Sequence, residues 1–175
     1  MKRFSLLAIT AMAFLTSYSQ QKDFLLKRPL LRSVDSIEHA NKGEEFNASF
    51  KISVSGNYFP NADKFNLAGP RIFFRKGNSF TIEMNYYYSI PDSIIRLVSY
   101  SWEGDPKRTA ELNSLFENNA TFFSGYFKQP GEIKNEPHDT WSQKSVTWQN
   151  DIVYVNQFMV WGQTTNRVRV LISWK

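Results

Sequence analysis

The chain contains no cysteine among its 175 residues. Disulfide bonds and thiolate metal sites are therefore excluded, and the fold has to be stabilised by an apolar core. The same absence excludes the leader of a bacterial lipoprotein, because such a leader ends at a cysteine that becomes lipid-modified.

Residues that carry chemistry are also scarce. The only two histidines are His39 and His138, and their spacing matches no metal-ligand pattern. There is no Gly-x-Ser-x-Gly motif for a catalytic serine and no glycine-rich phosphate loop. His138 stands between acids, in Glu136-Pro137-His138-Asp139, and we interpret this stretch as a solvated loop rather than a metal site. The sequence thus predicts no catalytic residues, no metal and no cofactor.

The positive charge of the chain is mild and scattered. The formal net charge is +5 and the pI is about 9.4, but lysine and arginine form no basic cluster. A nucleic-acid-binding domain usually concentrates these residues on one face. We therefore expect no nucleic-acid partner.

The first residues have the order of a secretory signal peptide. Lys2 and Arg3 precede an apolar run over residues 4–15, and Ser17 and Ser19 supply the small residues expected before a cut. The apolar run is shorter than the roughly 20 residues that a membrane-spanning helix needs. This order favours export over the alternative, a buried N-terminal helix.

We therefore predict a signal peptide over residues 1–19, and no stable membrane span after its cleavage. The protein is expected in the periplasm or outside the cell. Residues 20–45 are mixed and charged, which predicts a partly irregular N-terminal arm with a short helix near 36–41. Residues 46–175 are predicted to form one domain.

Period-two alternation of apolar and polar residues predicts most of that domain to be strands. On the segment 79–89, for example, Met84 and Tyr86 share one face while Glu83 and Tyr87 share the other. Between the strands, 56–70 and 132–139 are predicted to be loops. The predicted strands are 46–54, 71–75, 79–89, 94–102, 140–149, 152–161 and 167–174.

One segment has helical spacing instead. Asp105 is a suitable N-cap, Pro106 suits the first turn, and the apolar residues up to Lys128 lie on one arc of a helix. Asn119 falls inside this arc, where we expect a buried amide with a hydrogen-bond partner. The residues of the arc are Leu112, Leu115, Phe116, Phe122, Phe123, Tyr126 and Phe127.

The predicted fold class is therefore α+β. We expect a curved, mainly antiparallel sheet of about seven strands, with one long amphipathic helix packed on one face.

The function is predicted from the face of the sheet that this helix leaves free. Aromatic residues make up 16% of the chain, enough for a core and for a binding surface. Tyr87, Glu83, Arg167 and Arg169 are the candidate binding residues, since their positions in the alternation point away from the helix. We expect a non-enzymatic binding module for a partner protein or an apolar ligand of the cell envelope.

Two other hypotheses stay open. A carrier of apolar ligands would have an internal cavity lined by rings such as Phe80, Tyr86 and Phe123. A small cell-envelope hydrolase would use paired carboxylates, for which Glu83 and Glu103 are the candidates.

Overall fold

A computed structural model describes residues 24–175 except 48–53, 55, 57, 61 and 165. The predicted signal peptide and most of the predicted strand 46–54 lie outside the described residues. The other predicted strands and the long helix can be compared with the structure directly.

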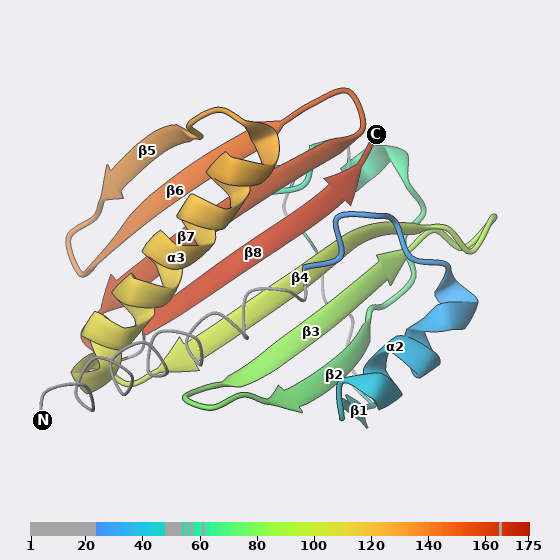
Figure 1. The fold of residues 1–175 in the computed structure, drawn as a ribbon, viewed down its shortest axis with the longest axis horizontal. Helices are drawn as coiled ribbons and strands as arrows, with labels where there is room; N and C mark the ends of the chain where they lie inside the picture. The colour runs from blue at the N-terminus through green and yellow to red at the C-terminus, as the bar shows by residue number, and fades with distance from the viewer. Residues whose placement is uncertain (1–23, 48–53, 55, 57, 61, 165) are drawn as a thin grey trace, which may run out of the picture.

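The described chain forms one antiparallel sheet of eight strands in the order β1-β2-β3-β4-β8-β7-β6-β5, with the helices on one face (Figure 1). This confirms the α+β class with a long helix packed on a sheet. The strands are β1 Glu44–Phe46, β2 Arg71–Lys76, β3 Thr81–Tyr88, β4 Ile95–Gly104, β5 Glu132–Pro137, β6 Trp141–Gln149, β7 Val153–Gly162 and β8 Asn166–Trp174.

The sheet consists of two meanders that meet at its centre. Strands β1 to β4 follow one another along the chain, and helix α3 (Thr109–Phe127) then carries the chain over the sheet to its far edge. Strands β5, β6, β7 and β8 return toward the centre, where β8 pairs with β4. The two central strands therefore join segments about seventy residues apart in sequence, as in the pair Tyr100 and Val170.

Strand β5 corrects the sequence analysis, which expected residues 132–139 to be a polar loop. Residues Glu132–Pro137 pair with β6 along their whole length. They form an edge strand on which every residue but Glu136 is exposed. An edge strand wet on both faces shows no apolar alternation, and charges such as Lys134 are typical of protected edges.

Helix α3 begins and packs much as predicted. The side chain of Asp105 accepts a hydrogen bond of 2.8 Å from the backbone N–H of Lys107, and a short 3-10 turn, Pro106–Arg108, precedes the helix. Only Leu112, Phe116, Asn119 and Phe123 are fully buried against the sheet.

The buried arc of α3 is thus narrower than predicted. Tyr126, expected to face the sheet, is 47% exposed, and Asn119, 1% exposed, does occupy the arc. The expected partner of Asn119 is not found, because its Nδ2 makes no hydrogen bond within the described structure. A different buried amide links the sheet to α3: Gln157 of β7 donates from its Nε2 to the carbonyl of Phe116 at 2.7 Å.

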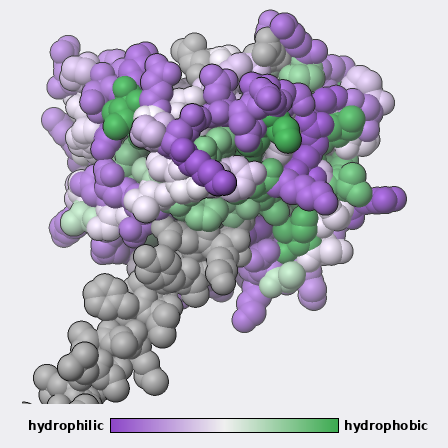
Figure 2. All heavy atoms as spheres, turned by 45° about the horizontal axis from the view of Figure 1, so that its top comes forward, coloured by the Kyte–Doolittle hydropathy of each residue, from purple (hydrophilic) through white to green (hydrophobic). Residues whose placement is uncertain are grey.

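Apart from the contacting pair Phe46 and Phe74, the large hydrophobic residues left on the surface of the described chain are dispersed. Figure 2 shows hydrophobic groups set among hydrophilic ones on the face it presents. The most exposed members come from different elements, for example Ile133 of β5 and Ile152 of the β6–β7 turn, at 61% and 70%. Scattered single residues of this kind are ordinary on a soluble surface and mark no interface by themselves.

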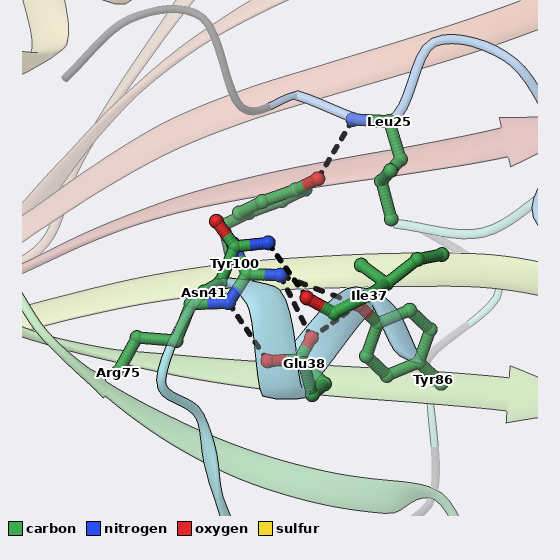
Figure 3. A network of polar contacts seen from close by, with 7 residues as sticks. All are labelled: Leu25, Ile37, Glu38, Asn41, Arg75, Tyr86 and Tyr100. Atoms are coloured by element: carbon green, nitrogen blue, oxygen red, sulfur yellow. Dashed lines mark hydrogen bonds and ion pairs between the residues drawn. The ribbon is translucent and has the colours of Figure 1, made fainter. Parts of the chain in front are cut away.

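A second helix, α2 (Val34–Ala40), covers the β1–β3 side of the same sheet face (Figure 1). A buried ion pair fastens it. Arg75 of β2 donates from Nε and Nη2 to the two carboxylate oxygens of Glu38, both at 2.8 Å, and the Tyr86 hydroxyl donates to the same carboxylate (Figure 3). Glu38 is 1% and Arg75 is 4% exposed.

The protonation states of Arg75 and Tyr86 follow from their burial together with their bonds to Glu38. Burial alone would lower the pKa of Arg75, but the hydrogen bonds and the charge of Glu38 outweigh it and the pKa is raised. Burial, followed by the hydrogen bond to Glu38, raises the pKa of Tyr86. The guanidinium stays charged and the phenol stays protonated, so both remain donors to Glu38.

Gly43 lets the chain pass close to this carboxylate after α2 ends. Its N–H donates to the carbonyl of Glu38 at 2.8 Å, and a Cβ at this position would lie 2.3 Å from Glu38 Oε2. A larger residue would therefore displace the partner of Arg75.

Residues 24–28 cover the sheet beside α3 and complete this face. The ring of Phe24 contacts Tyr100 of β4 and Phe123 of α3, with centroids 4.9 and 4.8 Å apart. The N–H of Leu25 donates to the Tyr100 hydroxyl at 2.8 Å (Figure 3), and Trp174 Nε1 donates to the carbonyl of Leu26 at 3.1 Å. Part of the segment expected to be an arm thus packs on the sheet.

Replacing Glu38 by Gln is expected to lower the free energy of unfolding by about 3 to 5 kcal/mol, because Arg75 would stay buried without its counter-charge. Urea denaturation measures the change. Glu44→Gln is the matched control, because Glu44 lies on the surface, 4.0 Å from Lys76, and the loss of such a pair costs below about 1 kcal/mol. An equal effect of the two substitutions would contradict the role given to Glu38.

Replacing Phe24 by Ala is expected to lower the free energy of unfolding by about 2 kcal/mol. This is less than the loss at a fully buried ring, because Phe24 is only half-buried. Leu30→Ala serves as the control, since Leu30 is 59% exposed and should change stability by under about 0.5 kcal/mol. Thermal and urea unfolding of both variants measure the difference. A negligible cost at Phe24 would mean that residues 24–26 do not belong to the core.

Candidate functional site

The face of the sheet opposite the helices carries the four residues selected from the sequence. Alternation along β3 places Glu83, Asn85 and Tyr87 on this face, whereas Met84 and Tyr86, both 0% exposed, face the helices. On β8, Arg167 and Arg169 likewise alternate with core residues. The predicted division of these two strands into faces is confirmed.

This face is more covered than the sequence analysis expected. Described residues between β1 and β2, such as Phe59 and Phe65, lie over it and form a second small core with Tyr87, Leu97 and Leu171. Within that segment, the ring of Tyr58 stacks on Phe158 of β7 at 4.7 Å between centroids. Tyr87 is consequently only 6% exposed. The described part of the predicted loop 56–70 therefore covers part of this sheet face, which sequence patterns do not reveal.

A cavity of about 470 Å³ lies between this segment and the strands. All four predicted residues line it, although they come from two strands separated by β4. The remaining lining residues are Phe46, Val54, Tyr58, Ile72, Phe74, Asn85, Ser99, Phe158 and Leu171. We refer to this space as the sheet cavity.

The register of the strands explains why these side chains meet. Glu83 pairs with Ser101 of β4, Ser101 pairs with Arg169, and Arg169 pairs with Phe158. A second row runs beside it, from Asn85 through Ser99 to Leu171. Since paired strands lie about 4.8 Å apart, an acid on β3 and a base on β8 flank a polar floor.

The charges that line the sheet cavity are unequally partnered. Arg167 donates from Nε to Glu103 at 3.0 Å and forms an ion pair with it. Glu83 accepts a hydrogen bond of 2.8 Å from Asn85 Nδ2. Arg169 has no ion pair and no hydrogen bond to any described residue, and its Nε is buried without a partner.

The environment of Arg169 is correspondingly unfavourable for a cation. Burial lowers its pKa, and the nearby positive charge of Arg167 lowers it further, while Glu83 acts in the opposite direction. An arginine nevertheless stays protonated in a protein. Arg169 is thus a half-buried positive charge. No carboxylate of a described residue lies within ion-pair distance to offset the free-energy cost of its desolvation.

Two other polar groups in the sheet cavity are buried without partners. These are the Oδ1 of Asn85 and the Oγ of Ser99, each on a residue that is 2% exposed. Buried polar atoms are nearly always hydrogen-bonded, so each exception calls for an explanation. Here they lie together with the unpartnered Nε of Arg169, on the lining of one space.

Tyr87 supplies a further hydroxyl to the cavity. Burial raises its pKa to about 12, with the charge of Arg169 opposing and that of Glu83 reinforcing the shift. The phenol is therefore protonated at neutral pH and can both donate and accept.

Sequence reasoning identified the charged half of the site and missed much of the rest. Asn85 shares the strand face of Glu83 and Tyr87, so alternation placed it correctly, but nothing in the sequence marked it as unpartnered. Ser99 and Phe158 become neighbours of Arg169 only through the strand pairing across the sheet centre. Tyr58 enters through an irregular segment with no periodic signal.

The rings proposed for a carrier cavity do not line the sheet cavity. Tyr86 and Phe123 are 0% exposed and belong to the packed core beneath α2 and α3, on the opposite side of the sheet. The alternation that places these rings on one face also places them under the helices, and the carrier cavity that they would line stays a prediction.

The other sequence candidates take ordinary positions. His138 stacks on Trp141, with ring centroids 3.6 Å apart. No group of three metal-ligating side chains occurs in the described part of the chain. None of its helices is long and apolar enough to cross a membrane.

The geometry of the sheet cavity is the main guide to function, because known proteins offer none. Comparison of the chain with protein-family models, with curated proteins and with solved structures finds no match.

Proposed function

We propose that this chain is a non-enzymatic binding module that takes a small ligand into the sheet cavity. The observation that carries this proposal is the set of three buried, unpartnered polar atoms on Asn85, Ser99 and Arg169, all on the lining of one space. A molecule in this space would lie beside all three residues, and each unpartnered buried group costs free energy in its absence.

The size and walls of the sheet cavity favour a small ligand over a partner protein. A volume of about 470 Å³ falls within the range of ligand pockets. Aromatic rings surround the polar floor, including Tyr58 and Phe158 on one side and the exposed pair Phe46 and Phe74 on the other. Rings of this kind suit the apolar or aromatic body of a ligand.

A partner protein finds less support. Stable protein interfaces bury about 800 Å² on each partner, and their cores are apolar. The exposed hydrophobic residues of this chain are instead dispersed among hydrophilic ones on the face seen in Figure 2.

The hydrolase hypothesis has no specific observation in its favour. Glu103 is engaged with Arg167, and Glu83 accepts from Asn85. We retain the hydrolase as the alternative. Turnover of a glycan by the wild type, abolished by Glu83→Gln, would establish it.

We further propose that the protein acts outside the cytoplasm, because its first residues have the order of a signal peptide. Expressed in full in a Gram-negative bacterium, it should be recovered from the periplasm or the medium with Gln20 as its first residue. N-terminal sequencing measures this. A charge in the apolar run, as in Leu7→Arg, should block processing. An uncut wild-type chain in the cytosol would refute the proposal.

The binding proposal is tested with phenylnaphthylamine, a neutral aromatic probe whose fluorescence rises in apolar sites. We expect saturable binding with one probe per chain. Ser99→Phe, which fills the cavity floor, should weaken binding by about tenfold or more, a loss of about 1.4 kcal/mol.

The matched control is Ser114→Phe, the same change at an exposed position on α3. It should leave probe binding as in the wild type, and circular dichroism of both variants verifies that they fold. If Ser99→Phe and Ser114→Phe bind the probe equally, or if the wild type shows no saturable binding, the sheet cavity is not a ligand site.

A further inference from the structure

We infer that the ligand of the sheet cavity is an organic anion whose carboxylate, sulfonate or phosphate group binds the guanidinium of Arg169. This inference rests on the proposed function and adds the chemical class of the ligand. It follows from the missing counter-charge of Arg169, from the neighbours of that side chain and from the walls around it.

The missing counter-charge sets the half-buried Arg169 apart from Arg75, which is buried on the opposite face of the sheet. Arg75 binds both carboxylate oxygens of Glu38, whereas Arg169 has no carboxylate within 4.0 Å among the described residues. The internal residues outside the described structure, 48–53, 55, 57, 61 and 165, include no aspartate or glutamate. These internal residues therefore contain no carboxylate that could neutralise this charge, which makes Arg169 available to an anionic ligand.

The neighbours of Arg169 suit an anion on the β8 side of the sheet cavity. A guanidinium presents its N–H groups as a planar fork that matches carboxylate and phosphate oxygens. The unpartnered hydroxyl of Ser99 can donate to the same group. Arg167 adds positive potential, although Glu103 already neutralises most of its charge.

Glu83 on the opposite wall orients the ligand. It stands in the row of Arg169, two strands away, and would repel an anion on the β3 side. The unpartnered Oδ1 of Asn85 beside it accepts but does not donate. The ligand should therefore direct its anionic group toward β8 and a hydroxyl or amine toward β3, with its apolar body against the rings.

A matched pair of probes separates charge from shape. Anilinonaphthalene sulfonate has the ring frame of phenylnaphthylamine plus one sulfonate group. We expect the wild type to bind the sulfonate about tenfold more tightly than the neutral probe, the scale of one charge-assisted hydrogen bond. Arg169→Met, which keeps an apolar stem, should remove this preference and leave affinity for the neutral probe within about twofold.

Two controls accompany this variant. Arg167→Met removes a charge that Glu103 already neutralises, so it should reduce the preference less than Arg169→Met does. The melting temperature of Arg169→Met should equal or exceed that of the wild type, because the substitution removes an uncompensated charge. A marked fall would indicate a structural ion pair instead and would overturn the inference.

The outcomes distinguish the two proposals. If the neutral probe binds at the Ser99 site but the sulfonate has no advantage, or keeps its advantage in Arg169→Met, the anion inference fails and the binding proposal stands. Equal loss of both probes in Arg169→Met would also overturn the inference. If neither probe responds to Ser99→Phe, the proposed function itself fails.

Discussion

The structure depends on the burial of its two central strands, β4 and β8, on both faces. The pairing of β4 with β8 joins the two meanders into one sheet. The sheet therefore stays whole only while the hydrogen bonds between these two strands are protected from water. A strand that is covered on both faces needs apolar side chains on both of those faces. On the α3 face these are Val98, Val170 and Ile172, all 0% exposed. The opposite side meets it only in part, through Leu97 and Leu171.

The two faces are consequently covered by different means. Over one face lie α3, α2 and residues 24–28, held by ring contacts and by the buried ion pair of Glu38 with Arg75. The buried charge of that cover, Glu38, is paired with Arg75 of the sheet, as a stable interior requires. Over the other face lies the segment around Tyr58 and Phe59, and beneath it the polar groups of Asn85, Ser99 and Arg169 remain unsatisfied. Unsatisfied buried polar atoms also occur under α3, on Asn119 and Gln157. The three on this face, however, belong to residues that line one cavity, as is expected of a functional site.

What the sequence could predict follows the same division. The face under the helices was predictable, because residues that are buried in one core repeat with the period of their element. Met84 and Tyr86 show the alternation of a strand, and Leu112 and Phe123 show the spacing of a helix. The edge strand β5 was not predictable, because Lys134 and its neighbours face water on both sides and leave no pattern. Alternation also placed Glu83, Tyr87, Arg167 and Arg169 on one face of the sheet. Their meeting in one cavity was not predictable, because it depends on long-range strand pairing and on an irregular segment. Nothing local to Arg169 reveals that it lacks a counter-charge.

The most direct measurement is a crystal structure of the protein grown with anilinonaphthalene sulfonate. We expect the probe in the sheet cavity, with its sulfonate within hydrogen-bond distance of the Arg169 guanidinium and its rings between Phe158 and Phe74. A structure in which Arg169 forms an ion pair with a carboxylate of the chain itself, and side chains of the chain fill the cavity, would contradict it.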